Sequence, residues 1–120
     1  MLFRSVVDTG TYAAGVLLTG ADEGVTYAGS PGISRIDGTF EMADSDYNTL
    51  FRLTLGATGT SVYLHGTSSD VTTNTTLRQV QILSSSTGIR IDGGLDNAII
   101  DSQISGSGSY GLYQIGRAHV

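Results

Sequence analysis

Residues 76–114 contain one sequence pattern twice. Leu77-Arg-Gln-Val-Gln-Ile82 returns as Ile99-Ile-Asp-Ser-Gln-Ile104, and Thr87-Gly-Ile-Arg-Ile91 returns at nearly the same spacing as Tyr110-Gly-Leu-Tyr-Gln114. Apolar and polar residues alternate within each run, which predicts two short strands in each copy. A unit this small cannot bury an apolar face alone, so we expect the copies to stack and to share one core.

The same pattern extends toward the N-terminus. Val62–Gly66 matches Ile89–Gly93 one repeat earlier, and Ser34–Gly38 matches both at a similar distance before that. Phe40–Met42 should stack on Val16–Leu18 of the preceding coil. We expect a second column of strands at Val25–Tyr27, Leu53–Leu55, Val80–Ile82 and Ser102–Ile104.

The chain resembles the right-handed parallel β-helix repeat family, the pectate-lyase-like and tailspike-like solenoids. Asn97 to Tyr113 looks like the usual coil of that family, and Gly10 to Gly38 looks like its common opening coil. The resemblance implies an all-β, right-handed parallel β-helix, here of about four coils, from a protein that is secreted or displayed on a cell surface; the ends described below lead us to expect that it is truncated from a longer chain. A small β-sandwich is the rival fold, but it would need antiparallel hairpins with short turns.

Strand alternation predicts which side chains face the core. The apolar side chains expected to point inward are Val16, Leu18, Val25, Tyr27, Ile36, Leu53, Leu55, Val62, Leu64, Val80, Ile82, Ile89, Ile91, Ile104 and Leu112. Ala43–Asn48 and Gly66–Thr75 are expected to be polar loops between coils, since both are rich in Asp, Ser, Thr and Asn.

The two ends look foreign to the repeat. Leu2-Phe-Arg-Ser5 and Gln114-Ile-Gly-Arg117 can be encoded by nucleotide strings of which the second contains the reverse complement of the first. Both resemble read-through of a sequencing adapter. We therefore expect residues 1–5 and 115–120 to be non-native ends, and residues 6–114 to be the β-helix fragment.

Composition excludes several classes of function. The net charge is -5 with no lysine, which argues against a nucleic-acid partner. The chain has no cysteine, so it has neither disulfides nor thiolate metal sites. No apolar run reaches the roughly 18 residues that a membrane-spanning helix needs. We expect no cofactor and no metal, and nothing in the sequence indicates an oligomeric state.

Alternation on the repeated strand also predicts an outward surface. The expected outward residues form two columns, Arg35, Tyr63, Arg90 and Tyr113 in one and Asp37, His65 and Asp92 in the other. Aromatic rings stack on sugars, and arginine and carboxylates bind polar ligands, so one interpretation is a surface that binds polysaccharide or cell-surface glycan. The other is a plain charge ladder in which Arg35 pairs with Asp37 and Arg90 with Asp92.

Catalysis has weaker support. The family includes polysaccharide lyases and glycoside hydrolases, but no run of this chain matches their active-site motifs, so no catalytic residue is nominated. The chain is then either a recognition segment, a spacer, or a non-catalytic part of such an enzyme. Asp44, Asp46 and Asn48 suggest an oxygen-rich calcium loop, although the pattern lacks the glycine and terminal glutamate of an EF-hand and fits a solvated loop better.

Overall fold

The chain forms a stack of short parallel strands. The computed structural model describes residues 3–6, 10–20, 23–30, 34–66, 72–83, 86–93, 96–105, 108 and 110–115. Fifteen strands follow one another along these residues, and every third strand joins the same sheet. Among these residues no helix is long and apolar enough to cross a membrane.

Three five-stranded sheets result. Sheet A contains β1 (Phe3–Val6), β4 (Val25–Ala28), β7 (Thr49–Phe51), β10 (Thr76–Arg78) and β13 (Ala98–Ile100). Sheet B contains β2 (Gly10–Tyr12), β5 (Ser34–Ile36), β8 (Thr54–Leu55), β11 (Gln81–Leu83) and β14 (Gln103–Ser105). Sheet C contains β3 (Val16–Leu18), β6 (Phe40–Ala43), β9 (Thr60–His65), β12 (Thr87–Asp92) and β15 (Tyr110–Ile115).

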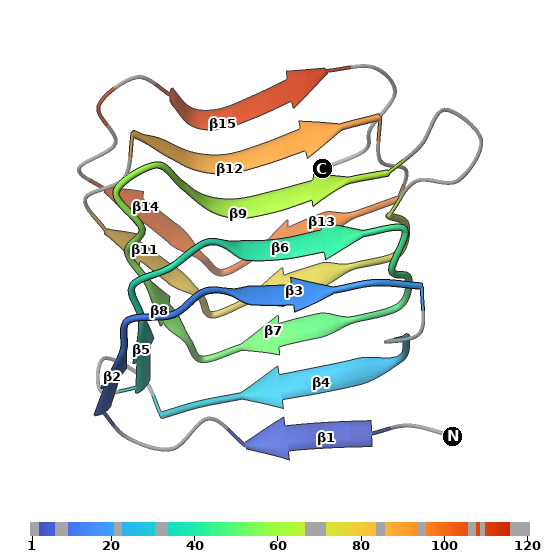
Figure 1. Cartoon of the computed structure of the whole chain (residues 1–120), viewed down its shortest axis with the longest axis horizontal. Helices are drawn as coiled ribbons and strands as arrows, with labels where there is room; N and C mark the ends of the chain where they lie inside the picture. The colour runs from blue at the N-terminus through green and yellow to red at the C-terminus, as the bar shows by residue number, and fades with distance from the viewer. Residues whose placement is uncertain are drawn as a thin grey trace.

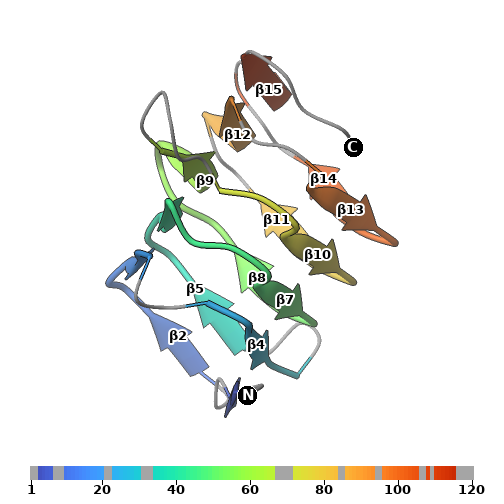
Figure 2. The same ribbon diagram turned by 90° about the vertical axis from the view of Figure 1, so that its right-hand side faces the viewer.

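The architecture is the predicted parallel β-solenoid. All strand pairs in the described residues are parallel, which rules out the β-sandwich. From β1 through β4, β7 and β10 to β13 the chain makes about four turns. In Figure 1 the strands of sheet C point to the right and those of sheet A point back to the left, while successive coils rise. Figure 2 shows the two sheets on opposite sides of the stack, with sheet C on the side that faces the viewer in Figure 1. The winding is therefore right-handed.

Aliphatic side chains from all three sheets fill the interior. The predicted inward set is confirmed for Leu18, Ile36, Leu53, Leu55, Val62, Leu64, Val80, Ile82, Ile89 and Ile91. Val16, Tyr27 and Ile104 are partly buried against this core, and Val25 is half-buried. Leu112 pairs with the fully buried Ile89, so its side chain leaves the inward face of the strand as predicted, but it is 39% exposed. It belongs to β15, the last strand of sheet C, which has a described neighbour on one side only.

Four large core side chains among the described residues were absent from the predicted set, as were the small residues Ala28 and Ala57. Phe40, Met42, Leu50 and Leu77 are at most 1% exposed. Phe40 and Met42 pair with Val16 and Leu18, as the sequence predicted. The Phe40 ring also meets the Tyr27 ring edge to face, with 5.5 Å between the centroids. Burial of each large apolar side chain contributes roughly 1.5 to 3 kcal/mol.

The predicted register is confirmed in the second half of the chain. Leu77 pairs with Ile99, Ile82 with Ile104, and Ile89 with Leu112, so the two copies of the repeated pattern are consecutive coils. Val62 pairs with Ile89, which confirms the predicted alignment of Val62–Gly66 with Ile89–Gly93.

Two of the alignments predicted for the first half are wrong, although that of Phe40–Met42 with Val16–Leu18 is correct. Ser34–Ile36 does not stack on Val62–Leu64: Ile36 pairs with Leu55 in sheet B, and Val62 pairs with Phe40 in sheet C. Likewise Tyr27 pairs with Leu50, not with Leu55. The cause is that alternation is the same in all three sheets, so a matching pattern alone does not say to which sheet a strand belongs.

Strand pairing also reaches the residues expected to be non-native. Phe3 to Val6 pair with Val25 to Ala28, and Ile115 pairs with Asp92. This pairing uses backbone groups only, which every residue other than proline carries. The assignment of residues 1–5 and 115–120 as non-native therefore stays a prediction.

The loop predicted at Ala43–Asn48 is a packed corner instead. Asn48 and Ser45 are fully buried, and the Asn48 amide donates a hydrogen bond of 2.6 Å to Ser45 Oγ. Asn48 Oδ1 accepts from the backbone N–H of Val25, one coil earlier, at 3.0 Å. Asn97 repeats the arrangement by accepting from the N–H of Thr75 at 2.9 Å. These amides satisfy backbone groups where the chain turns from sheet C into sheet A.

The turn from sheet B into sheet C requires glycine. A Cβ added to Gly38 would fall on the backbone of Gly15 and Ala14 in the preceding coil. Backbone cannot move aside as the end of a flexible side chain can, so Gly38→Ala should destabilise the fold by about 1 to 3 kcal/mol. Urea unfolding followed by circular dichroism measures the change.

Gly59→Ala is the matched control, because a Cβ at Gly59 meets nothing within 4 Å. It should alter stability by less than about 0.5 kcal/mol. Equal losses in the two variants would contradict the close coil contact at Gly38.

Candidate functional site

The outer face of sheet C carries a cluster of five polar side chains on three adjacent strands. Glu41 lies on β6, Tyr63 and His65 on β9, and Arg90 and Asp92 on β12. Their inward neighbours, such as Val62, Leu64, Ile89 and Ile91, are at most 1% exposed, so alternation directs the five outward. The register aligns Glu41, Tyr63 and Arg90 in one column. We call these five residues the sheet C cluster.

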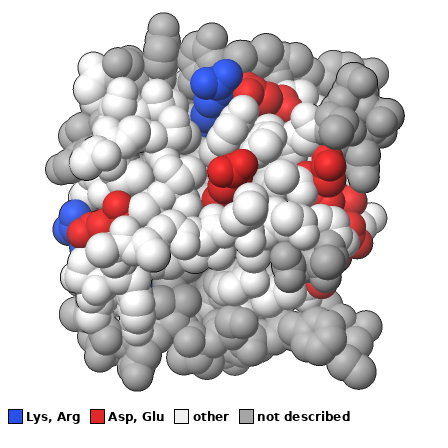
Figure 3. Space-filling model, viewed as in Figure 1, with Lys and Arg blue, Asp and Glu red and all other residues white. Residues whose placement is uncertain are grey.

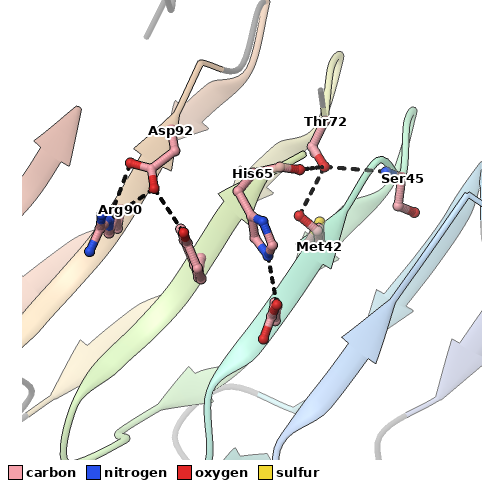
Figure 4. A network of polar contacts seen from close by, with 8 residues as sticks. Met42, Ser45, His65, Thr72, Arg90 and Asp92 are labelled. Carbon is pink, nitrogen blue, oxygen red and sulfur yellow. Dashed lines mark hydrogen bonds and ion pairs between the residues drawn. The ribbon is translucent and has the colours of Figure 1, made fainter. Parts of the chain in front are cut away.

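Hydrogen bonds connect the cluster across the strands (Figure 4). His65 Nε2 lies 2.6 Å from Glu41 Oε2, on the strand before it. On the other side, the Tyr63 hydroxyl donates to Asp92 Oδ2 at 2.8 Å. Arg90 Nε donates to both carboxylate oxygens of Asp92 at 3.1 Å. Each carboxylate therefore fixes the orientation of a neighbouring ring.

The rings of Tyr63 and His65 connect the contact with Glu41 to the contacts with Asp92. Tyr63 and His65 are two residues apart on β9, so their side chains leave the same face of the strand. Their rings stack at 4.1 Å between centroids with an interplanar angle of 18°. The Arg90 guanidinium carbon lies 5.3 Å from the centre of the Tyr63 ring. The five side chains form one continuous surface of aromatic rings, a guanidinium group and two carboxylates.

A buried hydroxyl fixes the backbone beneath one end of the cluster. Thr72 Oγ1 lies 2.9 Å from the carbonyl oxygen of Met42 and 3.0 Å from that of His65. It also accepts a hydrogen bond from the N–H of Ser45 at 3.2 Å (Figure 4). Thr72 thus connects the C-terminal ends of β6 and β9, which carry Glu41 and His65.

Two predicted site residues do not belong to the cluster. Arg35 lies on β5 in sheet B and Asp37 follows that strand, so the predicted column of Asp37, His65 and Asp92 is wrong. Arg35 Nε contacts Asp37 Oδ1 at 2.5 Å, and this pair packs over Gly56. The error follows from the register, because β6 rather than β5 is the strand that pairs with β9 in sheet C.

Glu41 is the residue of the sheet C cluster that sequence analysis missed. It takes the place that Asp37 was expected to hold beside His65. The signal was present in Phe40-Glu41-Met42, where two core residues flank one acidic residue and so direct it outward. Tyr113 pairs with Arg90 in the register, but its side chain lies outside the described residues.

Both ion pairs of the alternative charge-ladder interpretation are present. Arg35 contacts Asp37, and Arg90 contacts Asp92. Their charged side chains are between 24% and 41% exposed, and such pairs contribute about 0 to 1 kcal/mol each. The pairs therefore add little to stability, and their presence leaves the binding interpretation untested.

Asp46 and Asn48, two of the residues suggested as a calcium loop, form hydrogen bonds to neighbouring coils instead. Asp46 Oδ1 accepts from the backbone N–H of Thr73 at 2.8 Å and lies 3.1 Å from its hydroxyl. Asn48 is buried and bonded to the preceding coil. Within the part of the chain that the structure describes, no group of three or more histidine or acidic side chains is placed to hold a metal ion.

Comparison with protein-family models, with curated proteins and with solved structures gave no match for this chain. What is established is therefore the fold itself, a β-solenoid with three parallel sheets. The likeness to the pectate-lyase-like and tailspike-like proteins rests on the sequence resemblance alone.

The cluster raises the pKa of Tyr63 above its ordinary value of 10.0. The main cause is the hydrogen bond that its hydroxyl donates to Asp92, followed by burial and the negative charge of Asp92. Arg90 acts in the opposite direction, and Glu41 adds a small further increase. Tyr63 therefore keeps its proton more strongly in the folded protein than in the unfolded chain.

Asp92→Asn should lower the pKa of Tyr63 toward 10.0, because it removes the charge while an amide oxygen can still accept the hydrogen bond. An NMR titration of tyrosine carbon-13 signals measures the shift, with Tyr63→Phe identifying the signal. Asp37→Asn is the control, since it removes the same charge from sheet B. An unchanged Tyr63 pKa in Asp92→Asn would show that the hydroxyl does not contact Asp92.

The same shift predicts a dependence of stability on pH. Since the folded-state pKa is the higher one, the contribution of Tyr63 is fully present below pH 10.0 and is lost as pH rises through the folded-state value. Tyr63→Phe should remove this part of the alkaline loss of stability, as seen in unfolding curves compared at several pH values. Parallel declines in the two proteins would contradict it.

Proposed function

We propose that this chain is a structural and recognition segment of a larger, secreted or surface-displayed β-helix protein, and that it binds carbohydrate through the sheet C cluster. One observation carries the proposal: two rings, a guanidinium and two carboxylates form a single bonded surface across three strands. Aromatic faces and edges contact the apolar side of a sugar ring, and carboxylates accept hydrogen bonds from its hydroxyls.

The cluster is ordered before any ligand arrives. Tyr63 and His65 are held by Asp92 and Glu41, so little side-chain freedom remains to be lost on binding. The side chains are also accessible, with His65 24% and Glu41 36% exposed. A rigid polar surface of this kind suits repeated, weak contacts with an extended polymer better than enclosure of a small molecule.

The surface location fits the rest of the chain. Parallel solenoids present long, flat sheets to solvent, and their outward residues change without loss of the core. A secreted or surface location and membership of the pectate-lyase-like group are parts of the proposal that rest on the sequence resemblance. The acidic composition, without lysine, agrees with a ligand other than nucleic acid.

Affinity gel electrophoresis through a panel of polysaccharides tests the proposal. The wild-type chain should be retarded by at least one of them. His65→Ala should weaken retardation several-fold, because it removes one ring of the stack and leaves Glu41 without its partner. Tyr63→Ala should abolish it, because Tyr63 contacts both His65 and Asp92.

Arg78→Ala is the matched control, since Arg78 is an exposed arginine on β10 of sheet A. Its retardation should equal that of the wild type. Absence of retardation by every polysaccharide, or equal losses in all variants, would identify the chain as a spacer.

A further inference from the structure

The charges of the sheet C cluster bear on the class of sugar that it can hold, an inference that rests on the carbohydrate-binding function proposed above. Glu41 and Asp92 contribute two carboxylates, whereas Arg90 contributes the one permanent positive charge. The carboxylates lie on β6 and β12, on either side of β9, so about 10 Å of surface separates their backbones. A ligand across the cluster therefore meets an acidic group at both ends.

The positive charge of Arg90 is already paired with the Asp92 carboxylate. Its Nε donates to both oxygens of Asp92, and its guanidinium also lies against the Tyr63 ring. A sugar carboxylate that approached Arg90 would therefore lie beside the Asp92 carboxylate that Arg90 already contacts. Like charges brought together at an interface oppose binding strongly.

Paired basic groups and additional acidic groups are also seen over the face of the molecule shown in Figure 3. Where basic groups appear among the coloured atoms in Figure 3, each lies against acidic ones, while acidic groups also appear apart from basic ones. No lysine is present in the chain to offer a flexible alternative cation. Over its described residues, this face therefore presents hydrogen-bond acceptors to hydroxyl groups, with no excess positive charge for an anion.

From this charge arrangement we infer that the cluster binds a neutral, hydroxyl-rich polysaccharide lying across strands β6, β9 and β12, and that it rejects uronate polymers. Glu41 and Asp92 accept hydrogen bonds from sugar hydroxyls at the two ends, and Tyr63 and His65 support the ring between them. The pairing of Asp92 with Arg90 is the specificity determinant, because it neutralises the group that would otherwise attract a sugar carboxylate.

The test uses each polysaccharide that retards the wild-type chain, before and after its primary hydroxyls are oxidised to carboxylates. Binding is measured by biolayer interferometry on immobilised polymer. Oxidation should weaken binding to the wild type by about tenfold or more. Asp92→Asn should weaken binding to the neutral polymer and strengthen binding to the oxidised one, because Arg90 then faces the ligand with one carboxylate fewer.

Asp37→Asn supplies the matched control. Like Asp92→Asn, it removes a carboxylate that pairs with an arginine two residues earlier in the chain. This pair, Arg35 and Asp37, belongs to sheet B and lies away from the cluster. The preference of Asp37→Asn for neutral over oxidised polymer should equal that of the wild type. Circular dichroism confirms that both variants are folded before binding is compared.

The outcomes separate this inference from the function on which it rests. If the wild type prefers neutral polymer and only Asp92→Asn reduces or reverses this preference, the result supports both the inference and carbohydrate binding. Wild-type binding to uronate polymers as tight as to neutral ones, or equal gains in Asp92→Asn and Asp37→Asn, overturns the inference and leaves carbohydrate binding in place. Failure to bind any polysaccharide overturns both.

Discussion

Parallel hydrogen bonding between coils is the constraint on which the structure depends. Such short strands cannot satisfy their own backbone groups, so each takes its partners from the coil before and the coil after. The path of every coil must therefore return to the same register, whatever the length of its turns. Buried amides such as Asn48 and Asn97 extend this pairing through the corners, where backbone groups would otherwise be buried without partners.

Register also determines the composition of the sheet C cluster. Because side chains alternate along a strand, a shift of one residue in β9 would bury Tyr63 and His65 and expose Val62 and Leu64. The fully buried aliphatic column of Met42, Leu64 and Ile91 prevents such a shift. Placement of Glu41, Tyr63 and Arg90 side by side is thus a consequence of strand register and core packing.

Sequence periodicity predicted the fold and most of the cluster. In the second half of the chain the matching runs belong to the same sheet, so Tyr63, His65, Arg90 and Asp92 were aligned correctly. In the first half, Ser34-Arg-Ile-Asp-Gly38 resembles Ile89-Arg-Ile-Asp-Gly93 although the two lie in different sheets. Alternation carries no information about which sheet a strand joins, and that is why Arg35 and Asp37 were misplaced and Glu41 was missed.

The weakness of the surface contacts makes the cluster suitable for mutational analysis. The contacts of Glu41 with His65 and of Arg90 with Asp92 are partly exposed and contribute little to folding, whereas the residues beneath them are fully buried. Changing an outward side chain should therefore alter the surface without disturbing the coils. A ligand that covers the cluster and excludes water would strengthen those same hydrogen bonds, because the effective dielectric constant falls. Contacts that are nearly neutral for stability can thus still determine the ligand preference that is proposed for the cluster.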